Sequence, residues 1–260
     1  MNPTLRLLLA RKSIRAYEEG PIPEEVKNQI LEATFRAPTA GNMMLYSILE
    51  VKKQSLKDRL SETCDNQPFI ARAPLVLLFL ADYQRWNDYF LLSGVEGLCR
   101  AKEIPLRRPE EGDLFLACCD ALIAAQTAVI AAESFGLGSC YIGDIMENYE
   151  VHQKLFDLAP YTFPICLVCF GYPTQQQKDR PLTTRFGREF VLFEDRYARL
   201  QAPALRLMFA GLEERFLQGG EKPPRVENAG QEIYLRKFAA DFSVEMRRSV
   251  RAMLRVWSGA

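Results

Sequence analysis

The stretch DLFLACCDALIAAQTAVIAAESFGLGSCYIGDI, residues 113–145, decides the fold of this chain. From Leu114 to Phe135 it consists mainly of Ala, Leu, Ile, Val and Cys, interrupted by strongly polar side chains only at Asp120, Gln126 and Glu133. A helix of this composition is apolar on nearly every side, so we expect it to be buried at the centre of the protein. Its polar interruptions and its alanine-rich composition favour close packing against other helices over a membrane span.

The glycines that follow this helix shape the backbone beside it. Gly136 stands where a left-handed residue ends a helix, and Gly138 and Gly143 allow the segment Ser139–Ile145 to bend close to a planar or anionic ligand. The kind of ligand has to be inferred from other parts of the chain.

Length and composition place the chain among globular proteins. With 260 residues, 48% of them hydrophobic, it can bury a large core in one domain, or in one domain with an added arm. Lys and Arg together number 33, as do Asp and Glu, so no overall field attracts nucleic acid or an anionic membrane. We therefore expect no nucleic-acid partner and no membrane association, and any anion site must be local.

Two further features point to the cytoplasm. The N-terminal sequence MNPTLRLLLARKS has only a short apolar run and no small-residue cleavage site, so we interpret it as an amphipathic first helix and not as a signal peptide. The cysteines number seven, an odd count, and most lie within apolar runs, which is typical of reduced core thiols.

The single histidine, His152, excludes a zinc site built on a histidine pair and allows a catalytic triad only if His152 is its base. Its position after Tyr149 and Glu150, at the expected start of a helix, favours a surface residue instead. Cys166 and Cys169 have the spacing of a redox pair, but residues three apart in a strand face opposite sides, which favours core packing.

A basic segment near the N-terminus is a candidate anion-binding site. Arg11, Ser13 and Arg15 alternate, so an extended backbone would place two guanidinium groups and a hydroxyl on one face, which suits a phosphate monoester. Taken alone, the segment could equally be a solvated, charged connector.

The remaining pattern alternates helices with buried strands. Strands are expected at 45–51, 75–80 and 164–170, and helices at 3–10, from Pro21 to Pro38, at 54–60 and after Tyr149. Residues 83–112 mix aromatic and charged side chains and are interpreted as a helical excursion that covers a site. The run 175–181 is an exposed loop that again offers two cations, Lys178 and Arg180.

Beyond Phe190 the chain changes character. Helices are expected at 195–217 and 231–257. The arginines 247, 248, 251 and 255 of the second one favour a solvated helix face over a contact with the phosphates of a dinucleotide.

The order of four motifs resembles the nitroreductase family of flavin-dependent oxidoreductases. These are Arg-x-Ser-x-Arg at 11–15, RAPTAGN at 36–42, NQPFI at 66–70 followed by Ala73-Pro74 and an apolar strand, and AESFGLGSCYIG at 132–143. The similarity covers roughly residues 5–188. The SCYIG segment and the long C-terminal extension are similar to the NADPH-preferring, oxygen-insensitive nitroreductase and flavin reductase branch.

The resemblance implies an α+β protein with a three-layer α/β/α fold and a mixed sheet. It also implies an intertwined homodimer with FMN at each subunit interface. Residues 1–189 would form the FMN-binding domain, and residues 190–260 a helical C-terminal extension that packs on the partner subunit.

The same resemblance assigns the cofactor contacts. Arg11, Lys12, Ser13 and Arg15 would hold the FMN phosphate, and Thr39, Asn42 and Gln67 would line the ribityl chain and the pyrimidine edge. Arg180 would contact the phosphate or the ribityl chain, or stabilise charge near N1. Backbone groups of Tyr141, Ile142, Gly143 and Asp144 would line the ring near N5, and Lys178 would approach N1 and the C2 carbonyl. Some relatives have glycine where this chain has Asp144, so we expect that carboxylate to point away from the ring.

The activity implied is transfer of hydride from NAD(P)H through FMN to a small acceptor, a nitroaromatic, a quinone or a flavin, by a ping-pong mechanism. No catalytic side chain and no metal is required, because the flavin carries the chemistry. Two alternatives remain open at this point: a flavin-dependent dehalogenase or azoline oxidase, and a flavin-binding protein without turnover.

Overall fold

The computed structural model describes residues 1–220 and 222–259, and the chain divides into two compact units. The first contains residues 1–180 together with the end of the chain from Glu245, and the second contains residues 181–244. The unit boundary thus lies near the expected position 189, but the end of the chain belongs to the first unit.

The elements of the first unit are α1 (Pro3–Ala10), α2 (Glu24–Thr34), η1 (Ala40–Asn42), β1 (Tyr46–Glu50), α3 (Gln54–Thr63), α4 (Phe69–Arg72), β2 (Leu75–Asp82), α5 (Gln84–Leu92), α6 (Val95–Ala101), α7 (Glu111–Ser134), β3 (Gly138–Ile142), η2 (Asp144–Met146), α8 (Tyr149–Phe156), β4 (Thr162–Gly171), α9 (Gln175–Asp179) and most of α12 (Asp241–Ser258). The second unit contains η3 (Arg188–Phe190), α10 (Ala202–Gln218), α11 (Ala229–Ile233) and a π-helical turn (Tyr234–Phe238).

The sheet of the first unit has the strand order β1-β2-β4-β3, and every neighbouring pair is antiparallel. The expected mixed sheet is therefore wrong for these four strands; the parallel pairing in the described chain is the isolated bridge between Ser13 and Ser139. β3 itself was not expected as a strand. It is short and begins at a glycine, so its sequence carries no clear alternation, and its conformation depends on pairing with β4.

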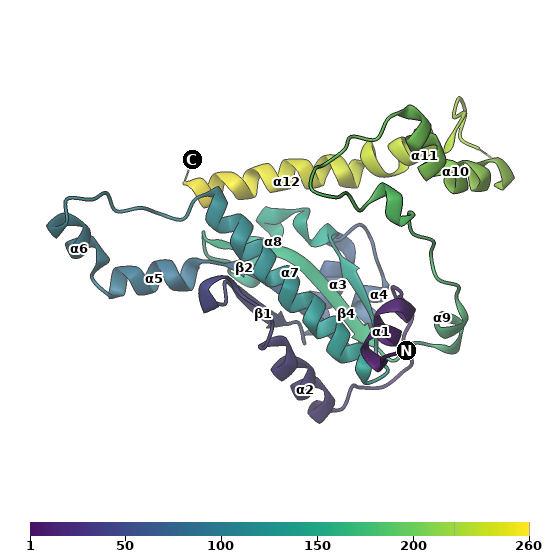
Figure 1. Ribbon diagram of the computed structural model, residues 1–260. Helices are drawn as coiled ribbons and strands as arrows, with labels where there is room; N and C mark the ends of the chain where they lie inside the picture. The colour runs from purple at the N-terminus through teal and green to yellow at the C-terminus, as the bar shows by residue number, and fades with distance from the viewer. Residues whose placement is uncertain (221, 260) are drawn as a thin grey trace. The chain divides into compact units, whose positions relative to one another are not determined.

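Helices cover both faces of this sheet, as the three-layer prediction requires (Figure 1). Leu77 and Phe79 of β2 pack in a core cluster with α7 and α2, whereas Val76 and Leu78 pack in a second cluster with α3 and α4. All eight residues of β2 are buried, as expected for a strand covered on both faces. Cys166 and Cys169 belong to the two different clusters, and all seven cysteines are free.

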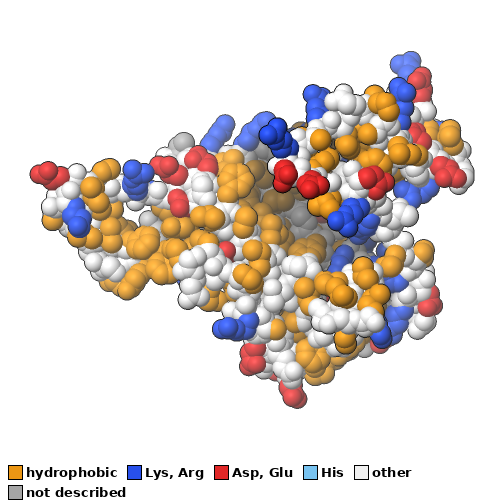
Figure 2. Space-filling model, in the orientation of Figure 1, with side chains coloured by type: hydrophobic (Ala, Val, Ile, Leu, Met, Phe, Trp, Pro, Cys, Tyr) orange, Lys and Arg blue, Asp and Glu red, His pale blue; other side chains and the backbone are white. Residues whose placement is uncertain are grey.

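The central helix α7 is buried on one side only. Nine of its residues are buried, most of them alanines that allow close approach to the sheet, and Gly136 ends it with φ +76°. The other side exposes Phe115, Leu116, Leu122 and Ile123, the first of them at 72%. In Figure 2, hydrophobic side chains also gather over α5 and α6. By length and composition alone α7 could cross a membrane, but its buried face belongs to the core of this unit.

His152 is fully buried, which corrects the expected surface position. Its Nε2 lies 2.8 Å from Thr63 Oγ1 and its Nδ1 2.9 Å from the carbonyl oxygen of Ile145. Burial lowers the pKa of this imidazole. The ring therefore ties α8 to η2 and to α3, and Thr63 of α3 is 89 residues away in sequence, too far for a local pattern to indicate.

The last helix, α12, packs on the core of its own chain. Met253 and Trp257 are buried beside α7, and Trp257 Nε1 donates to the Glu110 carbonyl at 3.0 Å. The long helix expected at 231–257 is interrupted by the π-helical turn, and the helix expected from Asp195 begins at Ala202, where Pro203 occupies the first turn.

Candidate functional site

The candidate site lies along β3, which is an edge strand of the sheet. The extended segment 11–15 runs beside the beginning of β3: the Ile14 N–H donates to the Ser139 carbonyl at 2.8 Å. The Ile14 side chain is buried, and a Cβ on Gly138 would come within 2.3 Å of it, so only glycine permits this approach. With Ile14 directed inward, an extended backbone directs the neighbouring Ser13 and Arg15 to the opposite face.

A segment about 160 residues further along the chain, from Gln177 to Arg180, completes the cation cluster. Gln177 Oε1 accepts hydrogen bonds from the Arg15 backbone N–H at 3.2 Å and from Arg180 Nη1 at 3.1 Å. Lys12 Nζ donates to the Lys178 carbonyl at 2.6 Å and to the Arg180 carbonyl. The structure thus brings Arg180 to the 11–15 segment. The sequence did not indicate that Gln177 links the two arginines, nor that Lys12 is occupied in holding the loop.

Two buried donors in this cluster have no hydrogen-bond partner. They are Arg11 Nη1 and Ser139 Oγ. Burial raises the pKa of the Cys140 thiol, while the nearby Arg15 and Arg11 lower it, which places both guanidinium groups around the start of β3. A buried donor without a partner costs about 1–3 kcal/mol. A bound phosphate would offset that cost, so the cluster fits an anionic group.

The other end of β3 carries a second polar group. Gln67 Nε2 donates to Asp144 Oδ2 at 2.7 Å and to the Cys64 carbonyl at 3.0 Å, so these two predicted residues lie side by side. Between the two ends, Tyr141, Ile142 and Gly143 follow the outer edge of the sheet. In the described part of the chain, the only segment bridged to that outer edge is the one containing Ser13.

Glu147 is a buried acid next to Asp144. It is 4% exposed, and its Oε1 has no hydrogen-bond partner. Burial, and then the neighbouring Asp144 and Asp65 carboxylates, raise the pKa of Glu147 to about 8. The group is therefore largely neutral at pH 7, which limits the negative charge at this end of β3.

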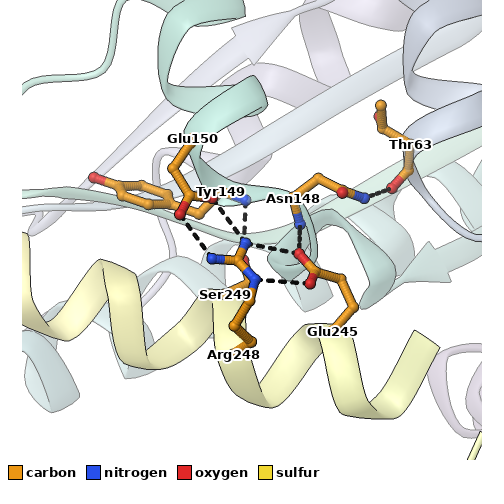
Figure 3. Close-up of polar contacts among 7 residues, drawn as sticks. All are labelled: Thr63, Asn148, Tyr149, Glu150, Glu245, Arg248 and Ser249. Atoms are coloured by element: carbon orange, nitrogen blue, oxygen red, sulfur yellow. Dashed lines mark hydrogen bonds and ion pairs between the residues drawn. The ribbon is translucent and has the colours of Figure 1, made fainter. Parts of the chain in front are cut away.

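The turn that contains Asp144 and Glu147 is held from two sides (Figure 3). Asn148 donates its side-chain N–H to the Thr63 carbonyl at 2.9 Å and its backbone N–H to Glu245 at 3.1 Å. Arg248 forms two 2.8 Å hydrogen bonds with Glu150, and Ser249 Oγ accepts from the Tyr149 N–H at 2.9 Å. The C-terminal helix α12 therefore fixes the position of the turn beyond β3.

Thr39 and Asn42 lie away from the cation cluster, in a loop that is held to Asp120 of α7. The Thr39 hydroxyl donates to the buried Asp120, which also accepts from the N–H groups of Ala40 at 2.9 Å and Leu45 at 3.0 Å. Asn42 is exposed, with φ +58°.

The loop containing Thr39 and Asn42 ends beside the opposite end of β2 from the cation cluster. The Leu45 carbonyl accepts from the N–H of Asp82, the last residue of β2. The cation cluster lies beside Ser139, which is aligned across the sheet, through Phe170 of β4, with Leu75, the first residue of β2. Eight residues of strand separate these ends by roughly 20–25 Å.

Lys178 is also turned away from the cluster. Its Nζ lies 3.0 Å from a Glu18 carboxylate oxygen, and both side chains are about half exposed. The excursion 83–112 forms α5, α6 and an apolar hollow whose lining includes Phe90, Val95 and Tyr161. No group of three or more metal-ligating side chains occurs within residues 1–220 and 222–259.

Comparison with known proteins supplies the context for this geometry. The Nitroreductase family matches residues 8–172. The FMN reductase (NAD(P)H) of Bacillus subtilis is 32% identical over 197 residues, which cover 76% of this chain and 75% of that protein. The oxygen-insensitive NADPH nitroreductase of Salmonella typhimurium is 27% identical and covers 86% of this chain and 87% of its own length.

The fold is shared with solved structures as well. NfrA2 of B. megaterium superposes with a TM-score of 0.78 at 25% identity, and the match covers 99% of this chain and 98% of that one.

Proposed function

This chain belongs to the nitroreductase family, and from that membership we propose that it is an oxidoreductase that uses FMN as cofactor and NAD(P)H as electron donor. The names of its relatives, FMN reductase and NADPH nitroreductase, support a reductase over a dehalogenase, an azoline oxidase or a flavin-binding protein without turnover. The observation that carries the proposal is the cation cluster with its unpaired buried donors at the start of β3.

The phosphate of FMN binds at this cluster. Arg15 and Arg180 supply guanidinium donors, Gln177 fixes the Arg180 side chain beside the Arg15 backbone, and Ser13 adds a neutral donor. Arg11 Nη1 and Ser139 Oγ gain the acceptor that they lack in the protein alone. Lys12 contributes by fixing the loop that carries Arg180 and only secondarily by its charge.

Main-chain groups of Tyr141, Ile142 and Gly143 along the outer edge of β3 would hold the ring system of FMN. The Gln67 amide would bind the polar edge of the ring, and its hydrogen bond to Asp144 Oδ2 directs that carboxylate toward the amide. The proton on Glu147 keeps a second negative charge away from the ring. Lys178 has to leave Glu18 before it can approach N1 and the C2 carbonyl.

FMN, when bound, supplies the hydride chemistry, accepting from NAD(P)H and delivering two electrons to the acceptor in a ping-pong sequence. The side chains of this protein bind and orient the cofactor, and none of them has to act as a nucleophile or a general base. The acceptor is a small oxidised molecule, a nitroaromatic, a quinone or a free flavin.

A second copy of the chain completes the site. Asn42 and the cation cluster lie at opposite ends of the sheet, so one cofactor cannot contact both within a single chain. In a homodimer, each copy supplies its 39–42 segment to the FMN that the other copy holds. The exposed apolar side of α7, with Phe115, Leu116, Leu122 and Ile123, provides the surface for this association.

The seven free cysteines support a reducing compartment, and we place the protein in the cytoplasm.

An absorption spectrum of the purified protein tests the proposal. The protein should be yellow, with the two visible bands of oxidised flavin, and NADPH without acceptor should bleach them; a quinone or nitroaromatic should restore them. A colourless protein that binds no added FMN contradicts the cofactor assignment. A yellow protein that neither NADPH nor NADH bleaches contradicts the enzyme assignment alone.

A further inference from the structure

One carboxyl group beside the phosphate cluster has no role in the function proposed above. Glu133 lies in the last turn of α7, and its Oε1 is buried without a hydrogen-bond partner. Together with Arg11 it lines a narrow apolar space between α1 and α7, whose other walls include Leu7, Val129 and Ile130.

Glu133 and Arg11 face each other without a direct ion pair. Neither Arg11 Nη1 nor Glu133 Oε1 has a hydrogen-bond partner, and the salt bridges of the described chain do not include this pair. Two opposite charges in one apolar space still stabilise each other, because the local dielectric constant is low. Each therefore offsets part of the desolvation cost of the other.

Two weak acids of β3 near this pair are neutral at pH 7. Tyr141 of β3 donates its hydroxyl to Gln126 at 3.2 Å, and burial raises its pKa far above neutrality. Burial also raises the pKa of Cys140, although Arg15 and Arg11 oppose the shift. Glu133 is thus the acid of this space that can titrate near neutral pH: burial raises its pKa to about 7, with Arg11 opposing.

We infer that Glu133 is a positioning residue of the phosphate site, which balances the charge of Arg11 before the cofactor binds and takes up a proton when the phosphate arrives. The inference rests on the proposed binding of FMN. The phosphate brings a charge of about −2 to the same guanidinium. A carboxylate already close to Arg11 is then repelled, so protonation of Glu133 becomes more favourable and Arg11 is left to the phosphate.

Calorimetry of FMN binding to the apoprotein tests this coupling. The titration is run at about pH 7.5, where the free phosphate is already mostly dianionic because its second pKa is near 6, in two buffers of different ionisation enthalpy. If the Glu133 pKa rises by about one unit, the protein should take up roughly half a proton. Glu133→Gln should show little proton uptake, and Glu25→Gln, a change in an exposed carboxyl of α2, should behave as the wild type.

The pH dependence of the affinity gives a second readout. From about pH 6.5 to 8.5 the wild-type affinity should fall by up to about tenfold relative to that of Glu133→Gln. Equal proton uptake and parallel pH profiles for the two proteins overturn the inference while the cofactor assignment stands. If the variant does not fold, the absence of proton uptake by the wild type over this range overturns the inference by itself. A wild-type apoprotein that does not bind FMN contradicts the proposed function instead.

Discussion

At the scale of single residues, phosphate binding by the cation cluster depends on arginines that come from distant parts of the chain. Gln177 Oε1 accepts from the Arg15 backbone N–H and from the Arg180 guanidinium, so it fixes Arg180 beside the segment that carries Arg15. The double variant Arg15→Ala, Arg180→Ala should therefore purify without flavin. The ratio of visible to 280 nm absorbance measures the occupancy. Arg59→Ala, on the exposed surface of α3, should leave the protein yellow, and a fully yellow double variant would remove the phosphate assignment.

Glu147 gives the stability of the protein a predictable pH dependence. Burial and the nearby Asp144 raise its pKa from 4.5 to about 8, so the folded protein holds this proton more tightly than the unfolded chain. The resulting stabilisation is complete below about pH 4.5 and is lost as the pH rises through about 8.

Glu147→Gln removes this dependence. When the pH is raised from about 5 to 8.5, the free energy of unfolding of the wild type should fall by at least about 1 kcal/mol more than that of the variant. Denaturant titrations at the two pH values measure the change. Glu62→Gln, which alters an exposed carboxyl on α3, should follow the wild type; a Glu147→Gln variant that does the same would show that the folded protein does not hold this proton.

At the scale of elements, α12 is held to the first unit by two kinds of contact. Trp257 is 1% exposed, stacks edge-on against Tyr161 with 5.5 Å between ring centroids, and donates to the Glu110 carbonyl. Arg248 joins Glu150 and Glu245 at the surface, where salt screens the charges.

These contacts should differ strongly in energy. Trp257→Ala should cost about 3–5 kcal/mol, because it opens a cavity beside α7. Arg248→Ala should change the stability little, but it should loosen the turn around Asn148 and accelerate amide hydrogen exchange there. Chemical denaturation and hydrogen exchange measure the two effects. Equal stability losses for both variants would contradict the view that the buried tryptophan is the main anchor of α12.

At the scale of the whole molecule, the exposed side of α7 predicts that the chain works as a dimer. Leu122→Asp with Ile123→Asp places two charges on that surface, and their desolvation opposes association. Light scattering should then give the 29.7 kDa of one chain, where the wild type gives twice that mass. The variant should also lose FMN, because the 39–42 segment of the second copy is absent.

The conservative pair Leu122→Met with Ile123→Val keeps the surface apolar and should remain dimeric and yellow. A monomeric variant that retains stoichiometric FMN would show that one chain suffices for the site.

The sequence by itself determined the elements whose character is local. The helix over the apolar run of α7, the fully buried β2 and the extended backbone at Ser13 and Ile14 are confirmed, because each is set by composition or periodicity within a short stretch. The family and its cofactor could also be predicted, since the order of the four motifs along the chain can be recognised without knowing where the loops lie in space.

Only the tertiary structure decided what depends on contacts between distant segments. β3 becomes a strand by pairing with β4, and His152 is buried because Thr63 lies opposite it. Gln177 joins two arginines, and the Thr39 hydroxyl turns to Asp120 within its own chain. None of these positions carries a distinguishing local pattern. Their roles follow from which polar groups must find partners once the core is packed, and packing is a property of the whole chain.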